Sequence, residues 1–151
     1  MVDLSVDDLQ RVAAEFRAAI ERSRAEKAVP LLPYFPEGAC KLVSWLLALH
    51  LRRRGATNRI QFVTGHFPGA GAYARHAWLL VDDAVVDLTA DPFGEAPVVV
   101  GLPTRFHEGL DERDELDAAM GITGFSSDEA ARYHRLLGPI EARMPGFVPP
   151  A

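Results

Sequence analysis

Three residues of this sequence carry the side chains of a thiol-dependent catalytic triad. Cys40 is the only cysteine, and His76 and Asp87 follow it in two segments rich in β-branched and aromatic residues. A thiol is a strong nucleophile only as a thiolate, and a nearby imidazole favours that anion. A carboxylate beside the imidazole completes the parts of a Cys-His-Asp hydrolase or acyl transferase. The elements around these residues decide whether the three can meet.

The segment 39–54 is predicted to be the helix that positions Cys40. It is strongly apolar in its middle, and Gly55 follows it as an expected end signal. Cys40 then lies in the first turn, where free N–H groups stabilise a thiolate and can form an oxyanion hole with the Cys40 N–H. The alternative for a lone cysteine is a buried small hydrophobic residue.

A β-hairpin is predicted to position His76 and Asp87. The runs 75–81 and 84–89 flank Asp82-Asp83, which suit a two-residue turn. Such a turn pairs Val81 with Ala84, so His76 is expected opposite Thr89 and Trp78 opposite Asp87. All four side chains then share one face, with Asp87 diagonal to His76. We expect this face to pack against the Cys40 helix.

Two alternatives concern the carboxylate. Asp91 lies on the same face as Asp87 and is a second candidate to orient His76, although Pro92 follows it. Asp87 itself stands in an apolar run, where a carboxylate requires a partner. If that partner is a backbone N–H or an arginine, the role of Asp87 is structural.

Three further residues are candidates for contact with a substrate. Trp78 is expected to pack beside His76 and Asp87 and to shield them from water, although an ordinary core tryptophan is an equal alternative. Gly38 precedes Cys40 closely, and His66 ends the strand before the hairpin. A histidine in such a loop is more often simply solvated.

A metal site is the remaining alternative function for these side chains. His66 and His76 with Asp87 or Asp91 offer suitable ligand types, but no HExxH or similar spacing supports them. We therefore expect no metal and no cofactor. The other histidines have no evident partner in the sequence: His50, His107 and His134.

The remaining elements indicate an α+β fold, an antiparallel sheet packed on a central helix that bears the cysteine at its N-terminus. We expect one domain over 1–151, with a core at about 36–101. The other predicted elements are flanking helices 6–27 and 126–144, strands 59–64 and 98–100, a loop over 65–71 and a short helix over 111–119.

The charge, the cysteine count and the hydropathy of the chain argue against several classes of protein. The formal net charge of -5 argues against a nucleic-acid binder, and the basic run 52–54 lies at a predicted helix C-terminus, where it complements the dipole. A single cysteine excludes an internal disulfide framework. No apolar run is long enough to span a membrane, and the first residues lack an apolar signal region. These features predict a cytoplasmic protein.

Three blocks in order resemble the transglutaminase-like branch of the papain-like cysteine enzymes. They are Gly38-Ala39-Cys40 opening an apolar helix, His76-Ala77-Trp78-Leu79, and Val86-Asp87-Leu88-Thr89. The likeness covers about residues 36–101 and is strongest to small bacterial members. Two positions of this sequence differ from the pattern of that family. Lys41 follows the cysteine where many members have an aromatic residue, and Glu37 lies where a glutamine would complete an oxyanion hole.

The resemblance implies a thiol-dependent amide hydrolase or acyl transferase that acts through a thioester. Cys40 would be the nucleophile, His76 the base and Asp87 its orienting acid. The implied substrate is a peptide, a protein or a small amide, and the oligomeric state is left open. Two alternatives share the fold: a catalytically silent module that binds a peptide or protein, and a bacterial toxin or effector deamidase domain.

Overall fold

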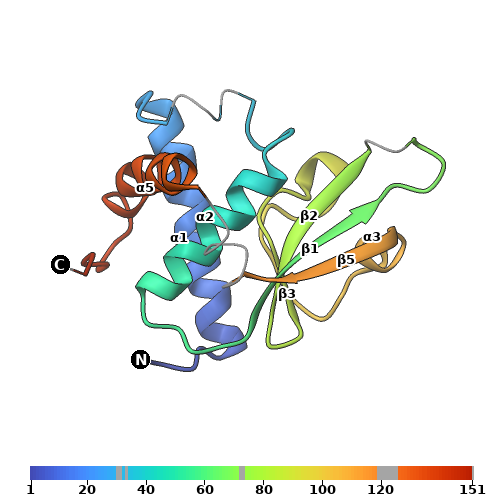
Figure 1. Ribbon diagram of the computed structural model, residues 1–151, viewed down its shortest axis with the longest axis horizontal. Helices are drawn as coiled ribbons and strands as arrows, with labels where there is room; N and C mark the ends of the chain where they lie inside the picture. Colours follow the sequence, from blue (N-terminus) through green and yellow to red (C-terminus); the bar gives the residue numbers. More distant parts are fainter. Residues whose placement is uncertain (30–31, 33, 72–73, 119–125, 151) are drawn as a thin grey trace.

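The chain folds as one layer of helices against one antiparallel sheet (Figure 1). The computed structural model describes residues 1–29, 32, 34–71, 74–118 and 126–150. Within them the sheet has five strands in the order β4-β3-β2-β1-β5. The helices are α1 (Val6–Ala25), α2 (Cys40–Arg53), α3 (Arg105–Glu108) and α5 (Ser127–Glu141), with a 3-10 turn η1 (Asp91–Phe93). The strands are β1 (Ile60–His66), β2 (Arg75–Val81), β3 (Ala84–Asp87), β4 (Val99–Gly101) and β5 (Asp111–Asp117). The predicted α+β class with an antiparallel sheet is confirmed.

The long helices begin and end close to the predicted positions because their end signals are local. Ser5 caps α1 and forms a capping box with Asp8. Cys40 is the first residue of α2, and no side chain caps the turn that it begins. Ser126 caps α5 by accepting a hydrogen bond from the backbone N–H of Glu129. None of the described helices is long and apolar enough to cross a membrane.

The main core lies between the helices and one face of the sheet. Trp45 of α2 stacks on Phe62 of β1, with ring centroids 4.4 Å apart. Phe16 of α1 and Leu46 of α2 have no exposed surface. From β2, this face receives the alternate residues Ala77, Leu79 and Val81. α2 packs on β2 and β1 while α1 packs on β4 and β3, and the middle of α2 is buried throughout, as its apolar character predicts.

The hairpin has the predicted turn and register. Asp82 and Asp83 both have positive φ, 47° and 71°, as a two-residue hairpin turn requires. Val81 pairs with Ala84, and Leu79 with Val86. Strand β3 ends at Asp87 and is shorter than the predicted run 84–89, so Thr89 lies beyond it.

The prediction for 111–119 was wrong, because residues 111–117 form the edge strand β5 and not a helix. This run is almost entirely charged and shows no alternation of apolar and polar residues. Hydrogen bonds from β1 determine its structure, and β1 itself continues through Gly65 and His66, which we expected in a loop. The short helix α3 was not predicted either.

The expected packing of the His76 face was also wrong. His76 and Trp78 alternate with Ala77 and Leu79, and the latter pair faces α2. The face that carries Trp78 is covered by a second, smaller apolar cluster built on Val63, Trp78, Val85 and Leu110. Alternation makes this outcome inevitable once α2 packs on the odd-numbered residues of β2.

Candidate active site

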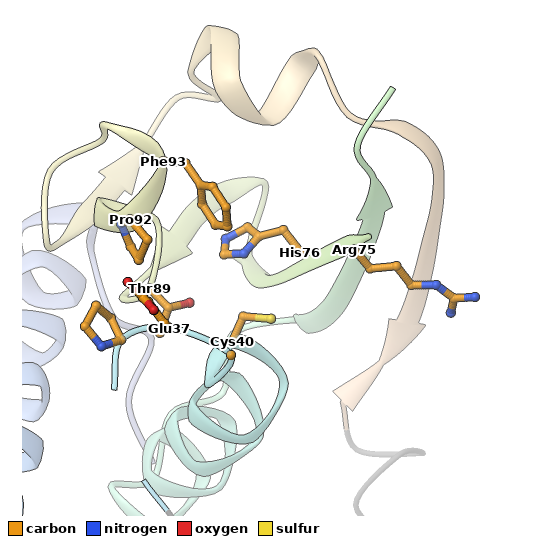
Figure 2. A pocket seen from close by; sticks show the side chains of 9 residues that line it. Glu37, Cys40, Arg75, His76, Thr89, Pro92 and Phe93 are labelled. Atoms are coloured by element: carbon orange, nitrogen blue, oxygen red, sulfur yellow. The ribbon is translucent and has the colours of Figure 1, made fainter. Parts of the chain in front are cut away.

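The thiol of Cys40 lies at the N-terminal end of α2, partly buried against the sheet (Figure 2). It hydrogen-bonds to the imidazole of His76 and accepts from the backbone N–H groups of Ala77 and Lys41. The Lys41 N–H belongs to the first turn of α2, which has no side-chain cap.

The early end of β3 lets Cys40 reach His76, although α2 covers the opposite face of the sheet. Beyond Asp87, no strand in the described part of the chain pairs with the start of β2 on that side. The end of α2 lies there instead, because the sulfur accepts from the Ala77 N–H and the Ser44 hydroxyl donates to the Ala77 carbonyl at 3.5 Å. The thiol thus meets the His76 ring at the edge of the sheet.

The His76 ring is held between the thiol and a carboxylate. Its Nε2 lies 2.7 Å from Asp87 Oδ2, which leaves Nδ1 for Cys40. The residue is 1% exposed. Trp78 stacks on the ring with centroids 5.9 Å apart, and Phe93 and Phe106 meet it edge-on at 5.3 and 5.4 Å. This packing fixes the plane of the imidazole.

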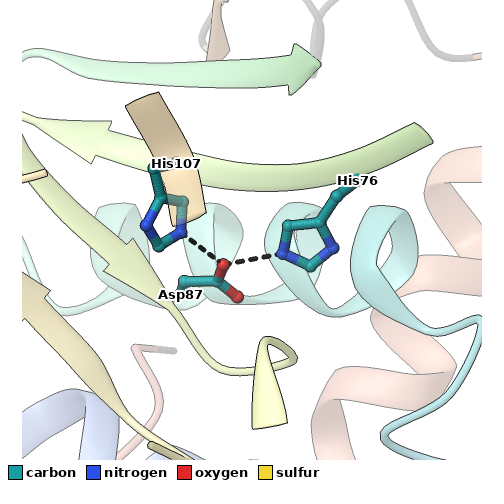
Figure 3. A group of neighbouring side chains, drawn as sticks. All are labelled: His76, Asp87 and His107. Carbon is teal, nitrogen blue, oxygen red and sulfur yellow. Dashed lines mark hydrogen bonds and ion pairs between the residues drawn. The ribbon is translucent and has the colours of Figure 1, made fainter. Parts of the chain in front are cut away.

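Asp87 is buried, and both oxygens of its carboxylate accept hydrogen bonds. Oδ2 accepts from His76 and, at 2.8 Å, from Nε2 of His107 (Figure 3). Oδ1 accepts from the Thr89 backbone N–H at 2.9 Å and lies 3.4 Å from its hydroxyl. Its diagonal position relative to His76, predicted from the hairpin, is the observed one.

The ionisation of the three groups follows from these contacts. Burial opposes a charge on Cys40, but the hydrogen bond and charge of His76 outweigh it and lower the thiol pKa. Burial likewise disfavours imidazolium, yet Asp87 and Cys40 raise the pKa of His76 to about 9. The pKa of Asp87 falls to about 2, against burial, because His107 and His76 donate to it. The arrangement favours a thiolate-imidazolium pair.

His107 is the site residue that sequence reasoning missed. It is fully buried, and its Nδ1 lies 2.8 Å from the hydroxyl of Thr104, which caps α3. The capping threonine three residues ahead was a local signal for a short helix. Nothing in the sequence placed that helix beside Asp87, however, so the contact could not be foreseen.

A cavity of about 380 Å³ opens beside the thiol. Its walls come from the segment before α2, the start of β2 and the turn after β3 (Figure 2). The lining residues are Pro36, Glu37, Gly38, Cys40, Arg75, His76, Thr89, Pro92 and Phe93. A molecule in this cavity touches both Cys40 and His76.

The other predicted site residues divide between the cavity and its surroundings. Gly38 lines the cavity as expected. Trp78 does not line it; the residue is 1% exposed and packs against the His76 ring, as the expected shielding role requires. His66 ends β1 and is not among the lining residues. Asp91 binds Arg17 through both oxygens at 2.8 Å and does not orient His76.

The side chains suited to a metal differ from those expected. One ligand atom each from His76, Asp87 and His107 lies within 4.8 Å of the others, and His66 is not part of this group. The carboxylate oxygen already accepts hydrogen bonds from both rings, at 2.7 and 2.8 Å. A cation would have to replace both bonds in a buried site, so the residues fit a hydrogen-bonded cluster better than a metal centre.

Comparison of the chain with protein-family models, with curated proteins and with solved structures finds no match.

Proposed function

We propose that the chain is a thiol-dependent amide hydrolase or acyl transferase with Cys40 as nucleophile. The observation that carries the proposal is the continuous hydrogen-bonded series from Cys40 through His76 to Asp87, with its thiol end on the wall of a cavity. The partly buried Cys40 of a helix and the buried His76 and Asp87 of two strands converge here. An ordinary buried cysteine needs neither partner.

The chemistry follows from the positions of the atoms. His76 Nδ1 holds the thiol proton, and the sulfur attacks the carbonyl carbon of an amide in the cavity. His76 then gives that proton to the leaving nitrogen as the C–N bond breaks, which leaves a thioester on Cys40. Water or a second amine attacks the thioester, loses a proton to His76 and releases the thiol. Asp87 keeps Nε2–H directed toward itself, which selects the reactive tautomer.

The papain-like, transglutaminase-like core belongs to this proposal. A cysteine that begins a helix, a histidine on one strand of a hairpin and an aspartate on the next occur here in the order of that superfamily. The likeness is one of motif and arrangement. It supports the acyl-transfer chemistry and does not choose between hydrolysis, deamidation and transfer.

The cavity favours a substrate with an apolar group beside the reacting amide. Pro36, Pro92 and Phe93 form apolar walls, and Phe93 is 48% exposed. Glu37, which is exposed, adds a carboxylate and disfavours an acidic group at that wall. A peptide or small amide with an aliphatic or aromatic side chain fits this lining.

The test is the rate at which Cys40 reacts with iodoacetamide at pH 6. A paired thiolate reacts there, whereas a free thiol with a pKa of ~8.5 is almost entirely protonated. We expect the wild type to react at least about tenfold faster than a free cysteine peptide, and His76→Ala to remove the advantage. Cys40→Ala serves as the unlabelled control.

Activity-based profiling extends the test to catalysis. Peptide and acyl-amide electrophiles with apolar side chains should label the wild type and not Cys40→Ala. A wild type that reacts no faster than a free cysteine, in a folded protein, would contradict the proposal and favour a silent binding module.

A further inference from the structure

We propose that His107 is a positioning residue of this site, which holds the carboxylate of Asp87 in the orientation that His76 requires. The inference rests on the proposed function, since it assigns His107 a part in activating Cys40. His107 touches neither the thiol nor the cavity. Its effect on Cys40 has to pass through Asp87 and His76.

The geometry around Asp87 carries the proposal. A single oxygen, Oδ2, accepts from Nε2 of both histidines, at 2.7 Å from His76 and 2.8 Å from His107 (Figure 3). The second oxygen is held by Thr89. A carboxylate with donors on both oxygens and from two directions on one of them cannot rotate away from His76 without breaking a buried hydrogen bond.

The far side of the His107 ring is fixed as well. Its Nδ1 lies 2.8 Å from the Thr104 hydroxyl, and that hydroxyl also lies 3.3 Å from Glu95 Oε1. When the hydroxyl donates to Nδ1, the ring carries its proton on Nε2 and can only donate to Asp87. The ring packs edge-on against Trp78 at 4.9 Å and Phe106 at 5.1 Å, so it has one available orientation.

A purely structural role is the alternative, since buried polar groups need partners in any case. Structure alone does not require the second donor to meet the same oxygen that His76 uses. The hydrogen bond from His107 is also the largest influence that opposes burial in lowering the pKa of Asp87. It thereby keeps Asp87 charged beside His76 at acidic pH.

The experiment is the pH profile of Cys40 alkylation by iodoacetamide, from pH 4.5 to 9.5, in three forms of the full chain. His107→Leu removes the donor, and His107→Gln keeps an N–H near the position of Nε2. We expect His107→Leu to react at least about tenfold more slowly at pH 6. Its acidic limb, which reports the ionisation of Cys40, should move to higher pH, because Asp87 without this donor supports an imidazolium beside the thiol less well. His107→Gln should stay within about threefold of the wild type.

The titratable groups near this network are Cys40, His76, Asp87 and Glu95. None of them is altered in the two His107 variants. A shift of the acidic limb therefore reports how well Asp87, without His107, supports the pair of His76 and Cys40.

A matched control is available in His50, which is equally buried and also bonded to a carboxylate, Glu141. His50→Leu should lower the melting temperature while the alkylation profile stays that of the wild type. Should His107→Leu fail to fold, Thr104→Val replaces it, with a smaller shift in the same direction.

Two results would overturn the inference. A folded His107→Leu with the wild-type profile leaves His107 with a structural role only, while the proposed function stands. A wild type that lacks enhanced reactivity at pH 6 overturns both.

Discussion

Among the buried histidine–carboxylate pairs of the described residues, His76 with Asp87 and His50 with Glu141 differ most in what surrounds them. In the sheet, His76 bonds to Asp87 at 2.7 Å, and in the helical layer His50 bonds to Glu141 at the same distance. All four residues are at most 2% exposed. Distance and burial alone therefore do not mark a site.

The charges nearby separate the two histidines. Burial lowers the pKa of His50, the hydrogen bond to Glu141 opposes it, and the cations Arg54 and Arg53 add to the lowering. Arg53 also binds Glu141 at 2.9 Å and satisfies that carboxylate. The pKa of His76 instead rises to about 9, because its neighbours are Asp87 and the thiol. A carboxylate shared with arginine stabilises a fold, whereas a carboxylate that receives only neutral or imidazolium donors leaves the histidine basic.

Access completes the contrast. The ring of His76 reaches Cys40 on a cavity wall, and backbone N–H groups of Ala77 and Lys41 also point at the sulfur. His50 contacts Phe16 and Phe147 and does not line the cavity. The lesson is that a titratable pair becomes chemically useful when its other side faces a reactive group.

The largest expected difference between the pairs comes from removing each carboxylate charge. Asp87→Asn should slow Cys40 alkylation at pH 6 by roughly two to four orders of magnitude, as loss of the orienting aspartate does in serine proteases. Its melting temperature should also fall, because the raised pKa of His76 depends on the charge of Asp87. Glu141→Gln should likewise cost about 1–3 kcal/mol of stability, but with an unchanged alkylation rate. Thermal unfolding and alkylation kinetics of both variants measure this.

Equal effects of the two variants on alkylation would remove the distinction. In particular, a fully reactive Asp87→Asn would mean that Asp87 serves only the backbone and side chain of Thr89.

The pH dependence of stability should differ in sign for the two histidines. The pKa of His76 in the folded protein, about 9, exceeds the ordinary value of 6.5. Protonated His76 therefore adds its full share to the free energy of unfolding below pH 6.5, and this share is lost as the pH rises through 9. It amounts to at most roughly 3 kcal/mol. His50 has a lowered pKa, so its unfolded form takes up a proton first and stability falls as the pH drops below 6.5.

Urea unfolding between pH 5 and 10 tests these signs. His76→Gln should flatten the loss of stability on the alkaline side, and His50→Gln should flatten the loss on the acidic side. If both variants change the same side of the profile, the contrast between the two surroundings is wrong.

The smallest expected effect concerns the reason why the pKa of His50 is lowered. Arg54 Nη1 lies 3.4 Å from His50 Nε2, so it favours the neutral ring with a free lone pair on that nitrogen. Arg54→Gln should raise the pKa of His50, while the pKa of His76 is unaffected. Titration of the histidine ring signals by NMR measures both. No change at His50 would assign its lowered pKa to burial and to Arg53.

Several features of the site could be read from the sequence because they depend on neighbours along the chain. The place of Cys40 at the start of α2 follows from Gly38-Ala39 and the apolar run after it. The shared face of His76 and Asp87 follows from the period of a strand and the length of one turn. These local rules need no knowledge of the rest of the fold.

Other features depended on contacts between distant segments and could not be read in this way. Residues 111–117 form a strand only because β1 offers them an unpaired edge. α3 brings His107 to Asp87, 20 positions away in the sequence, and no periodicity reports such a distance. Asp91 has the same parity as Asp87, yet Arg17 of α1 binds it.

The sequence by itself determined the three chemical groups and the two elements that present them, since helix starts and hairpin register are set by adjacent residues. Only the tertiary structure decided which face of the sheet α2 covers, how the thiol passes the end of β3 to reach His76, and that a second histidine holds Asp87. Packing chooses among faces and partners by the total apolar surface that it buries, and that sum involves the whole chain at once.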